Sequence, residues 1–241
     1  MKYYFCILAL NEEKHLENTF QELKDVILES QIEDFKIIIY DDGSTDRTKE
    51  IANKIKFEED LNIEVISHKF NIGPAKTIKK FIENHKEGKF LVISGDNDLD
   101  KKLIKDLIIA SKKADFVLSY YLNREKKGWF RANLSTTLNL ILCTLFNVYV
   151  FYLQGPFVWP LDKVSKFKIN STGIAYACEV NIKLLHSDLK FIEVSGIMNT
   201  GSENSTSIKI KNFFDILRTI IFLLIDIKIK KTMFKKSKRI Y

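Results

Sequence analysis

Apolar runs of strand length and longer stretches of helical periodicity alternate through the first half of the chain. The apolar runs span residues 3–10, 36–40, 63–66, 90–93 and 116–119. Between them, apolar residues recur every three or four positions, as at Leu16, Phe20, Leu23 and Ile27. This βαβα order predicts an α/β fold with a mostly parallel central sheet flanked by helices. In such sheets ligands bind at the carboxyl ends of the strands.

The second half of the chain has a different pattern. Residues 132–161 contain no charged side chain, and residues 138–153 are nearly continuously apolar. Asn139, Thr144 and Asn147 interrupt this run, which is shorter than the roughly 20 apolar residues that a transmembrane helix needs. We therefore predict a buried or interfacial helix here.

Composition is that of an ordinary globular protein. The 241 residues are 46% hydrophobic and 12% aromatic, which suffices for one buried core. The three cysteines are odd in number and lie in apolar sequence, so we expect buried thiols rather than disulfides or a zinc site. The apolar run 3–10 is followed by Asn11 and Glu12 without a small-residue cleavage site, which favours a strand over a signal peptide. We therefore expect the protein to be exposed to the cytoplasm.

The positive charge is concentrated near the end of the sequence. The formal net charge is +7, and residues 209–241 hold ten Lys or Arg against two Asp. Residues 213–227 are also rich in Phe, Ile and Leu. A segment that is both basic and apolar is typical of binding to anionic lipid rather than nucleic acid. We predict that residues 206–241 form a basic amphipathic helical tail, which associates peripherally with the cytoplasmic face of a membrane or with a small membrane-protein partner.

Adjacent carboxylates follow the second predicted strand. Asp41 and Asp42 open the sequence Asp-Asp-Gly-Ser-Thr-Asp directly after residues 36–40. A carboxylate at the end of a strand can accept hydrogen bonds from a nucleobase or a ribose. The alternative is that both carboxylates only satisfy loop amides and the start of the next helix.

A second acidic group follows the fourth predicted strand. Asp96, Asp98 and Asp100 stand at alternating positions, which in an extended segment places their oxygens on one side. Hard oxygen ligands of this kind suit Mg²⁺ or Mn²⁺, with water and phosphate oxygens completing the coordination. The alternative is a solvated acidic turn in which Asp100 caps a helix beginning at Lys101.

Two further polar segments follow the other strands. Asn71-Ile72-Gly73-Pro74 opens a predicted helix, so its backbone amides could line a phosphate or ribose pocket. Asn11 and Glu12 follow the first strand, where helix-start chemistry and ligand contact both remain open.

In this order and spacing, these segments resemble the family 2 glycosyltransferases with the GT-A fold. The matching segments are Leu8-Ala9-Leu10-Asn11-Glu12, Asp41-Asp42-Gly43-Ser44-Thr45-Asp46, Asn71-Ile72-Gly73 and Asp96-Asn97-Asp98-Leu99-Asp100. Arg131, Ser135 and Asn139 are similar to the R-x-x-x-S-x-x-x-N stretch of dolichyl- and polyprenyl-phosphate sugar synthases. The resemblance covers roughly residues 3–225. It implies a GT-A domain over residues 1–205, with a nucleotide-sugar half (1–120) and an acceptor half (121–205).

The resemblance also implies roles for individual residues. The nucleotide sugar, linked to UDP or GDP, would contact Leu8, Ala9, Leu10, Asn11, Glu12, Asp41, Asp42, Asn71, Gly73, Asp96, Asn97, Asp98 and Arg124. The acceptor would contact Arg131, Ser135, Asn139 and Gln154. A Mg²⁺ or Mn²⁺ ion would be bound by Asp96, Asp98 and Asp100. The catalytic residues would be Asp98, Arg131 and, if the acceptor is a hydroxyl, Glu179 as general base.

The sequence departs from the family pattern mainly in the acceptor half. Leu8 replaces the usual Pro, which alters only a loop. Gly155-Pro156-Phe157 lacks the neighbouring Asp and Arg that the polyprenyl-phosphate enzymes commonly carry, and residues 199–205 lack the Arg of their R-x-x-G-x-S-K element. Hydroxyl-acceptor relatives often carry Glu-Asp where this chain has Glu179-Val180.

Several functions therefore remain in view. The favoured one is inverting transfer of a sugar to a polyprenyl phosphate such as a dolichyl or undecaprenyl phosphate. The alternatives are transfer to a saccharide hydroxyl in polysaccharide assembly, and a catalytically silent, membrane-docked module that binds nucleotide sugars. A nucleotidyltransferase would share the α/β core, but its glycine-rich, Arg-containing first loop is replaced here by Leu10-Asn11-Glu12.

Overall fold

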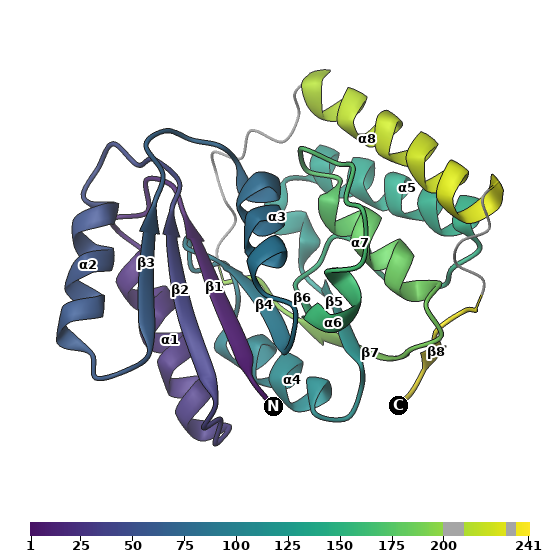
Figure 1. Ribbon diagram of the computed structural model, residues 1–241. Coiled ribbons are helices and arrows are strands. Elements are labelled where there is room, and N and C mark those ends of the chain that lie inside the picture. Colours follow the sequence, from purple (N-terminus) through teal and green to yellow (C-terminus); the bar gives the residue numbers. More distant parts are fainter. Residues whose placement is uncertain (200–209, 230–234) are drawn as a thin grey trace.

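A computed structural model describes residues 1–199, 210–229 and 235–241. Its first half alternates strands and helices as the apolar pattern predicts (Figure 1). The elements are β1 (Tyr3–Ala9), α1 (Leu16–Glu29), β2 (Phe35–Asp41), α2 (Thr48–Glu58), β3 (Ile63–Ser67), α3 (Pro74–Asn84), β4 (Lys89–Ser94), α4 (Lys101–Ser111) and β5 (Phe116–Tyr121). All five predicted strands are present within one or two residues of the predicted bounds.

The second half is mainly helical but contributes three more strands. Its elements are a 3-10 turn (Arg124–Lys127), α5 (Trp129–Phe146), β6 (Phe157–Pro160), α6 (Leu161–Val164), α7 (Tyr176–Leu185), β7 (Lys190–Gly196), α8 (Ile210–Leu223), a π-helical continuation of α8 (Leu224–Ile229) and β8 (Lys238–Arg239). The predicted domain boundary between residues 205 and 206 lies outside the described residues. So do residues 200–205 of the segment that lacks the Arg of the R-x-x-G-x-S-K element.

The strands form one sheet of eight in the order β3-β2-β1-β4-β6-β5-β7-β8. All neighbouring strands run parallel except β6, which is antiparallel to both β4 and β5. The fold is therefore mixed α/β with a mostly parallel sheet. Because strands buried on both faces need apolar side chains at every position, β1 places Phe5 and Ile7 in one core and Tyr4 and Cys6 in the other.

The two faces of the sheet are covered by different helices (Figure 1). Helices α1, α2 and α4 pack on one face, where Phe20, Ile55 and Leu107 join the same core. Helices α3, α5, α6, α7 and α8 contribute to the core on the other face, in which Phe81 and Trp159 are buried. The sheet thus presents the carboxyl ends of β1, β2 and β4 between two helical layers, where ligands bind in such folds.

The end of the tail differs from the amphipathic helix predicted for residues 206–241. Lys238 and Arg239 form β8, which pairs in parallel with β7. Arg239 forms an ion pair with Glu193 and donates a hydrogen bond to the backbone oxygen of Tyr149. The sequence indicated only a concentration of positive charge near the end of the chain. Two of its charged residues, Lys238 and Arg239, instead add a strand to the sheet.

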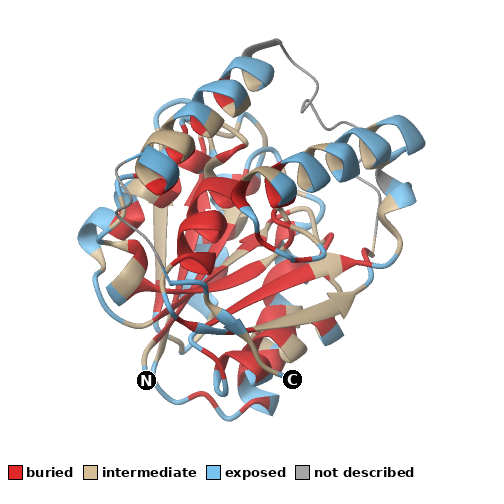
Figure 2. Ribbon diagram, turned by 90° about the vertical axis from the view of Figure 1, so that its right-hand side faces the viewer, coloured by how far each residue is buried: buried red, intermediate tan, exposed pale blue. Residues whose placement is uncertain are grey.

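Helices α5 and α8 lie at one end of the molecule, and each has an exposed apolar side (Figures 1 and 2). The exposed large apolar residues of α5 are Trp129, Phe130, Leu134, Leu140 and Ile141. Those of α8 are Phe213, Phe214, Leu217 and Ile221. No helix in the described ranges combines the length and the apolar character needed to cross a membrane. The predicted helix is present as α5 and is buried on one side, but it ends at Phe146; residues 147–153 of the apolar run lie outside it, and Phe157–Pro160 form β6.

Candidate active site

A cavity of about 410 Å³ opens where the carboxyl ends of β1, β2 and β4 meet. Its lining residues are Leu8, Ala9, Leu10, Glu12, Tyr40, Asp42, Asn71, Pro74, Thr77, Val92, Ser94 and Tyr176. Six of the residues predicted to contact a nucleotide sugar are among them: Leu8, Ala9, Leu10, Glu12, Asp42 and Asn71. The fold thus assembles one concave site from segments far apart in the sequence.

Asp42 is the centre of a hydrogen-bond network on the β2 side of the cavity. Its Oδ1 accepts a hydrogen bond from the backbone N–H of Ile72 (2.9 Å). The same oxygen lies 2.9 Å from Nδ1 of His68. Its Oδ2 accepts a hydrogen bond from the backbone N–H of Gly73 (2.8 Å). The amides at the start of α3, which were expected to line a phosphate or ribose pocket, are therefore directed at this carboxylate. His68 was not predicted, because a single histidine after a strand has no recognisable spacing.

Asp41 and Asn11 join the neighbouring loops. Asp41 is buried, and its Oδ1 accepts a hydrogen bond from the backbone N–H of Ser44 (2.9 Å). Asn11, in the left-handed region with φ of 58°, accepts one from the backbone N–H of Thr45 (2.8 Å). These contacts agree with the alternative that Asp41 satisfies loop amides, and they give Asn11 a similar role.

Glu12 lies close to the acidic group that follows β4. The pKa of Glu12 is raised to about 7, first because the side chain is partly buried and then because Asp96, Asp46 and Asp98 repel its negative charge. Asp96 and Asp98 also raise the pKa of Tyr121, after the larger effect of burial. Tyr121 thus stays protonated beside these carboxylates, a neighbour that the sequence did not reveal.

Asn97 and Asp100 both lie near Glu22 of α1. Asn97 donates a long hydrogen bond to Glu22 (3.5 Å). Burial raises the pKa of Glu22, and the negative charge of Asp100 raises it further. The expectation of an extended segment with its three carboxylates on one side was wrong. Asn97 has a left-handed φ of 55°, so the segment is not extended and the alternation of side chains is broken at that residue.

The residues present fit a divalent cation at Asp96 and Asp98. In the described part of the chain no three His, Cys, Asp or Glu side chains stand in a ready metal-binding arrangement. Mg²⁺ and Mn²⁺, however, are commonly bound through one or two carboxylates plus water and substrate phosphates. Burial raises the pKa of Glu12 most, and the repulsion from Asp96, Asp46 and Asp98 that adds to this rise is the electrostatic situation that a cation would relieve.

A second group of polar residues lies where the 3-10 turn meets α5. The guanidinium of Arg124 lies 4.8 Å from the centre of the Tyr152 ring. The Tyr152 hydroxyl is 2.6 Å from Oγ of Ser135. Burial raises the pKa of Tyr152, while the positive charges of Arg124 and Arg131 lower it, so both arginines are near this ring. Nη1 of Arg124 is buried and has no hydrogen-bond partner among the described residues.

Asn139 and Gln154 hold or border this group. Asn139 donates a hydrogen bond to the backbone oxygen of Phe151 (3.2 Å) and accepts one from the backbone N–H of Leu153 (2.9 Å). Gln154 accepts a long hydrogen bond from the Tyr152 hydroxyl (3.5 Å). Asn139 therefore fixes the loop that carries Tyr152, and its contact with an acceptor stays a prediction.

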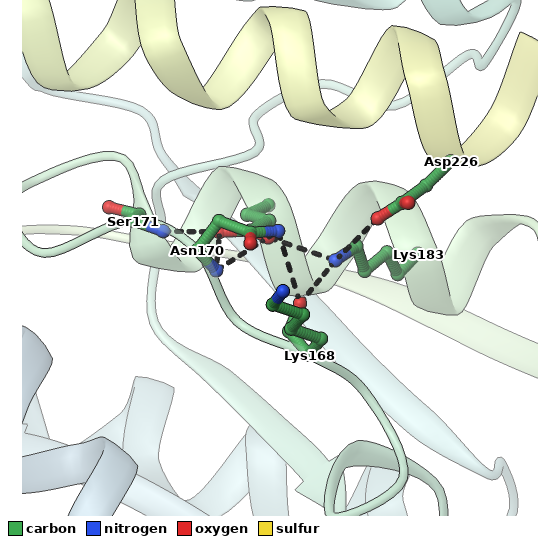
Figure 3. Close-up of polar contacts among 6 residues, drawn as sticks. Lys168, Asn170, Ser171, Lys183 and Asp226 are labelled. Carbon is green, nitrogen blue, oxygen red and sulfur yellow. Dashed lines mark hydrogen bonds and ion pairs between the residues drawn. The ribbon is translucent and has the colours of Figure 1, made fainter.

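Glu179 is fully buried and does not line the cavity. Its carboxylate accepts hydrogen bonds from the backbone N–H groups of Asn170 (2.9 Å) and Ser171 (2.7 Å) and from Nζ of Lys183 (2.9 Å) (Figure 3). A general base must reach the proton that it removes. This placement favours a structural role for Glu179 over the role of base.

The sheet with its cavity at the strand ends, and the carboxylates after β2 and β4, are arranged as in α/β enzymes that bind ligands at the carboxyl ends of their strands. The family model "Glycosyl transferase family 2" matches residues 4–169. Because this match covers more than half of the chain, the protein belongs to glycosyl transferase family 2. An uncharacterized protein of Methanocaldococcus jannaschii is 24% identical over 229 residues, covering 89% of this chain and 96% of that protein.

Solved structures show the same fold. The structure of residues 1–349 of TarS from S. aureus in complex with UDP-GlcNAc matches with a TM-score of 0.65 and 16% identity, over 96% of this chain and 69% of that one. Mannosyl-3-phosphoglycerate synthase from Rubrobacter xylanophilus matches with a TM-score of 0.70 and 15% identity, over 93% and 74%. Glucosyl-3-phosphoglycerate synthase from Mycobacterium tuberculosis matches with a TM-score of 0.61 and 14% identity, over 93% and 79%. The chain has the GT-A fold of these proteins.

Proposed function

We propose that the protein transfers a sugar from a UDP- or GDP-linked donor to the phosphate of a polyprenyl lipid, with inversion, at the cytoplasmic surface of a membrane. The observation that carries the choice of acceptor is Arg124, whose buried Nη1 lacks a partner among the described residues beside Tyr152. A buried guanidinium N–H without an acceptor costs free energy that an anionic ligand would recover. Exposed apolar residues of α5, which begins five residues later, would lie along the lipid chain.

The donor would occupy the cavity at the strand ends. Asp42, already held by His68, Ile72 and Gly73, is oriented to contact the base or ribose, together with Glu12. This proposal is supported by the S. aureus TarS structure, which holds UDP-GlcNAc on the same fold. Asp96 and Asp98 would hold Mg²⁺ or Mn²⁺ against the diphosphate. A cation bound there would offset the negative charge that develops on the departing nucleotide.

The transfer itself needs few groups from the protein. An oxygen of the lipid phosphate attacks the anomeric carbon, the bond from that carbon to the nucleotide diphosphate breaks, and the configuration inverts. The acceptor is already an anion, so no base has to remove a proton from it. Arg124 and Arg131 would orient the lipid phosphate. The burial of Glu179 weighs against a saccharide hydroxyl as acceptor, because that reaction requires a base.

Transfer is tested by incubating the protein with labelled UDP- and GDP-sugars, polyprenyl phosphate in detergent, and Mg²⁺ or Mn²⁺. We expect label from one donor to enter the organic phase. Asp98→Asn should abolish this metal-dependent transfer. Asp106→Asn, a control on the solvent side of α4 where the carboxylate pairs with Lys102, should leave it intact. Arg124→Gln should raise the KM for the lipid phosphate by about tenfold and leave nucleotide binding unchanged. Label that appears only in water-soluble saccharide would overturn the choice of acceptor, and undiminished turnover of Asp98→Asn would overturn the metal site.

Membrane association is tested separately with sedimented vesicles that contain anionic lipid. Replacing Phe213 and Phe214 of α8 by Ser should reduce the bound fraction by tenfold or more, since each buried Phe contributes roughly 2 kcal/mol. Phe57→Ser is the control, because Phe57 is 91% exposed on α2 at the other side of the molecule. Equal binding of all variants would exclude α8 as the membrane contact.

A further inference from the structure

Helix α8 is attached to the rest of the protein through a buried carboxylate. Asp215 is 9% exposed and lies against residues 171–175, the segment that precedes α7. Its Oδ1 accepts a hydrogen bond from the backbone N–H of Thr172 (2.9 Å). Its Oδ2 accepts hydrogen bonds from the hydroxyl of Ser171 (2.9 Å) and the backbone N–H of Ala175 (3.2 Å). One side chain of α8 thus satisfies three donors of this segment.

One of these contacts, to the N–H of Ala175, serves the start of α7, which has no side-chain cap of its own. The first backbone N–H groups of a helix have no partner within the helix and are usually satisfied by a polar residue at the N-cap. The N-cap of α7 is Ala175, which has no side chain for this purpose. Asp215 supplies the carboxylate from another helix, at the end of α7 where negative charge is favourable. Gly173 leaves room for it, since a Cβ at that position would lie 2.8 Å from Oδ2 of Asp215.

The other side of the segment is held by α7 itself (Figure 3). Glu179 accepts hydrogen bonds from the backbone N–H groups of Asn170 and Ser171, and it pairs with Lys183 at 2.9 Å. Lys183 also lies 3.5 Å from Asp226, in the π-helical continuation of α8. The segment therefore lies between two carboxylates, of which Asp215 is the one that comes from α8.

The segment leads directly into the cavity wall. Tyr176 is the next residue, and among the lining residues it comes from the second half of the chain. Its ring packs edge-on against Trp159, with ring centres 6.3 Å apart. We propose that Asp215 is a positioning residue for sugar transfer: by ordering residues 171–175, α8 sets the position of Tyr176 in the donor cavity. This inference rests on the proposed function, and it links the helix with an exposed apolar face to the reaction site.

The direct test is hydrogen exchange of the full-length protein followed by mass spectrometry. Asp215→Asn places the N–H₂ donor of the new amide against the backbone N–H of Ala175. That N–H is also a donor and cannot turn away, so the hydrogen bond is lost. We expect exchange across residues 171–176 to become about tenfold faster or more, whereas exchange across residues 68–74, on the Asp42 side of the cavity, stays unchanged. Asp226→Asn is the matched control, because it removes another carboxylate, in the π-helical continuation of α8, that pairs with Lys183.

Kinetics separate positioning from a general loss of stability. With the donor identified by the transfer assay, Asp215→Asn should raise the KM for the nucleotide sugar by about tenfold below the unfolding temperature, and Asp226→Asn should leave it within twofold. Unchanged exchange at residues 171–176 in Asp215→Asn would overturn the inference, as would equal changes in both variants. The exchange measurement needs no substrate, so its outcome stands even if no transfer activity is found.

Discussion

The ion pair between Lys183 and Glu179 allows a stringent test of how the acceptor half is held together. The two groups are 2.9 Å apart, and their side chains are 2% and 0% exposed. Replacing Lys183 by Met keeps the volume similar but leaves the Glu179 carboxylate buried without its cation. Removal of one partner of a buried pair typically costs 3–5 kcal/mol. Since Asn170 and Ser171 still donate hydrogen bonds to Glu179, we expect about 3 kcal/mol.

The cost is measured by urea unfolding, with the slope compared to confirm that the unfolded state is unchanged. For a chain of this size a loss of about 3 kcal/mol corresponds to a melting temperature lower by roughly 10 °C. The matched control is Lys102→Met, which breaks a pair with Asp106 at the same helical spacing but with Lys102 76% exposed. That change should cost at most about 0.5 kcal/mol.

A double variant tests whether the unpaired charge is the cause. Adding Glu179→Gln to Lys183→Met removes the buried charge, and the Asn170 side chain can reverse its amide to accept from the new N–H₂ group. The double variant should be more stable than the sum of the two single losses by about 2 kcal/mol. Strict additivity, or a loss below about 1 kcal/mol for Lys183→Met alone, would refute the reasoning.

Three further predictions concern the site and its support. Because the pKa of Glu12 is raised to about 7 from 4.5, the folded state binds more protons than the unfolded state between these values, so stability falls as pH rises through this window. The free energy of unfolding, measured by urea titration, should fall between pH 5 and pH 8 by about 1 kcal/mol less in Glu12→Gln than in the original protein, after allowance for solvent exposure. Asp42→Asn should weaken binding of UDP or GDP by about tenfold in calorimetry, with equal affinity contradicting its role. Gly155→Ala should cost about 3 kcal/mol or prevent folding, because its Cβ would lie 1.9 Å from the Ser119 backbone oxygen, and a melting temperature within 2 °C of the original would contradict this packing.

The sequence predicted the strands that carry an apolar run. Strands β1, β2, β4 and β5 are largely buried, as expected where helices cover both faces of a sheet. The edge strand β3 is mostly half-buried, but its run is still rich in Ile and Val. The remaining strands lack this signal. Strand β6 is four residues long, β7 is half-buried and mixes polar with apolar residues, and β8 consists of Lys238 and Arg239. Their pairing depends on contacts distant in sequence, which no local pattern contains.

The site could be predicted in its location but not in its internal contacts. Carboxylates after strands indicated where a ligand binds, because strand ends gather at one edge of a parallel sheet. Side-chain direction in the following loops depends on single backbone angles. The left-handed φ of Asn97 breaks the alternation of side chains between Asp96 and Asp98, and no spacing rule anticipates it. Glu179 likewise stands at the position where relatives carry a general base, but here it is buried and paired with Lys183, one helical turn later.

The positions of the chain ends have a practical consequence for the choice of assay geometry. Residue 1 and residue 241 both lie at the end of the molecule away from α8 (Figure 1), and β8 anchors the second of them to the sheet edge. A protein captured on a sensor chip through a tag at either end would present α5 and α8 outward. Flowing lipid vesicles or nanodiscs could then reach this face without steric hindrance from the chip. Trimming the basic residues at the end, by contrast, would remove a strand rather than a loose appendage.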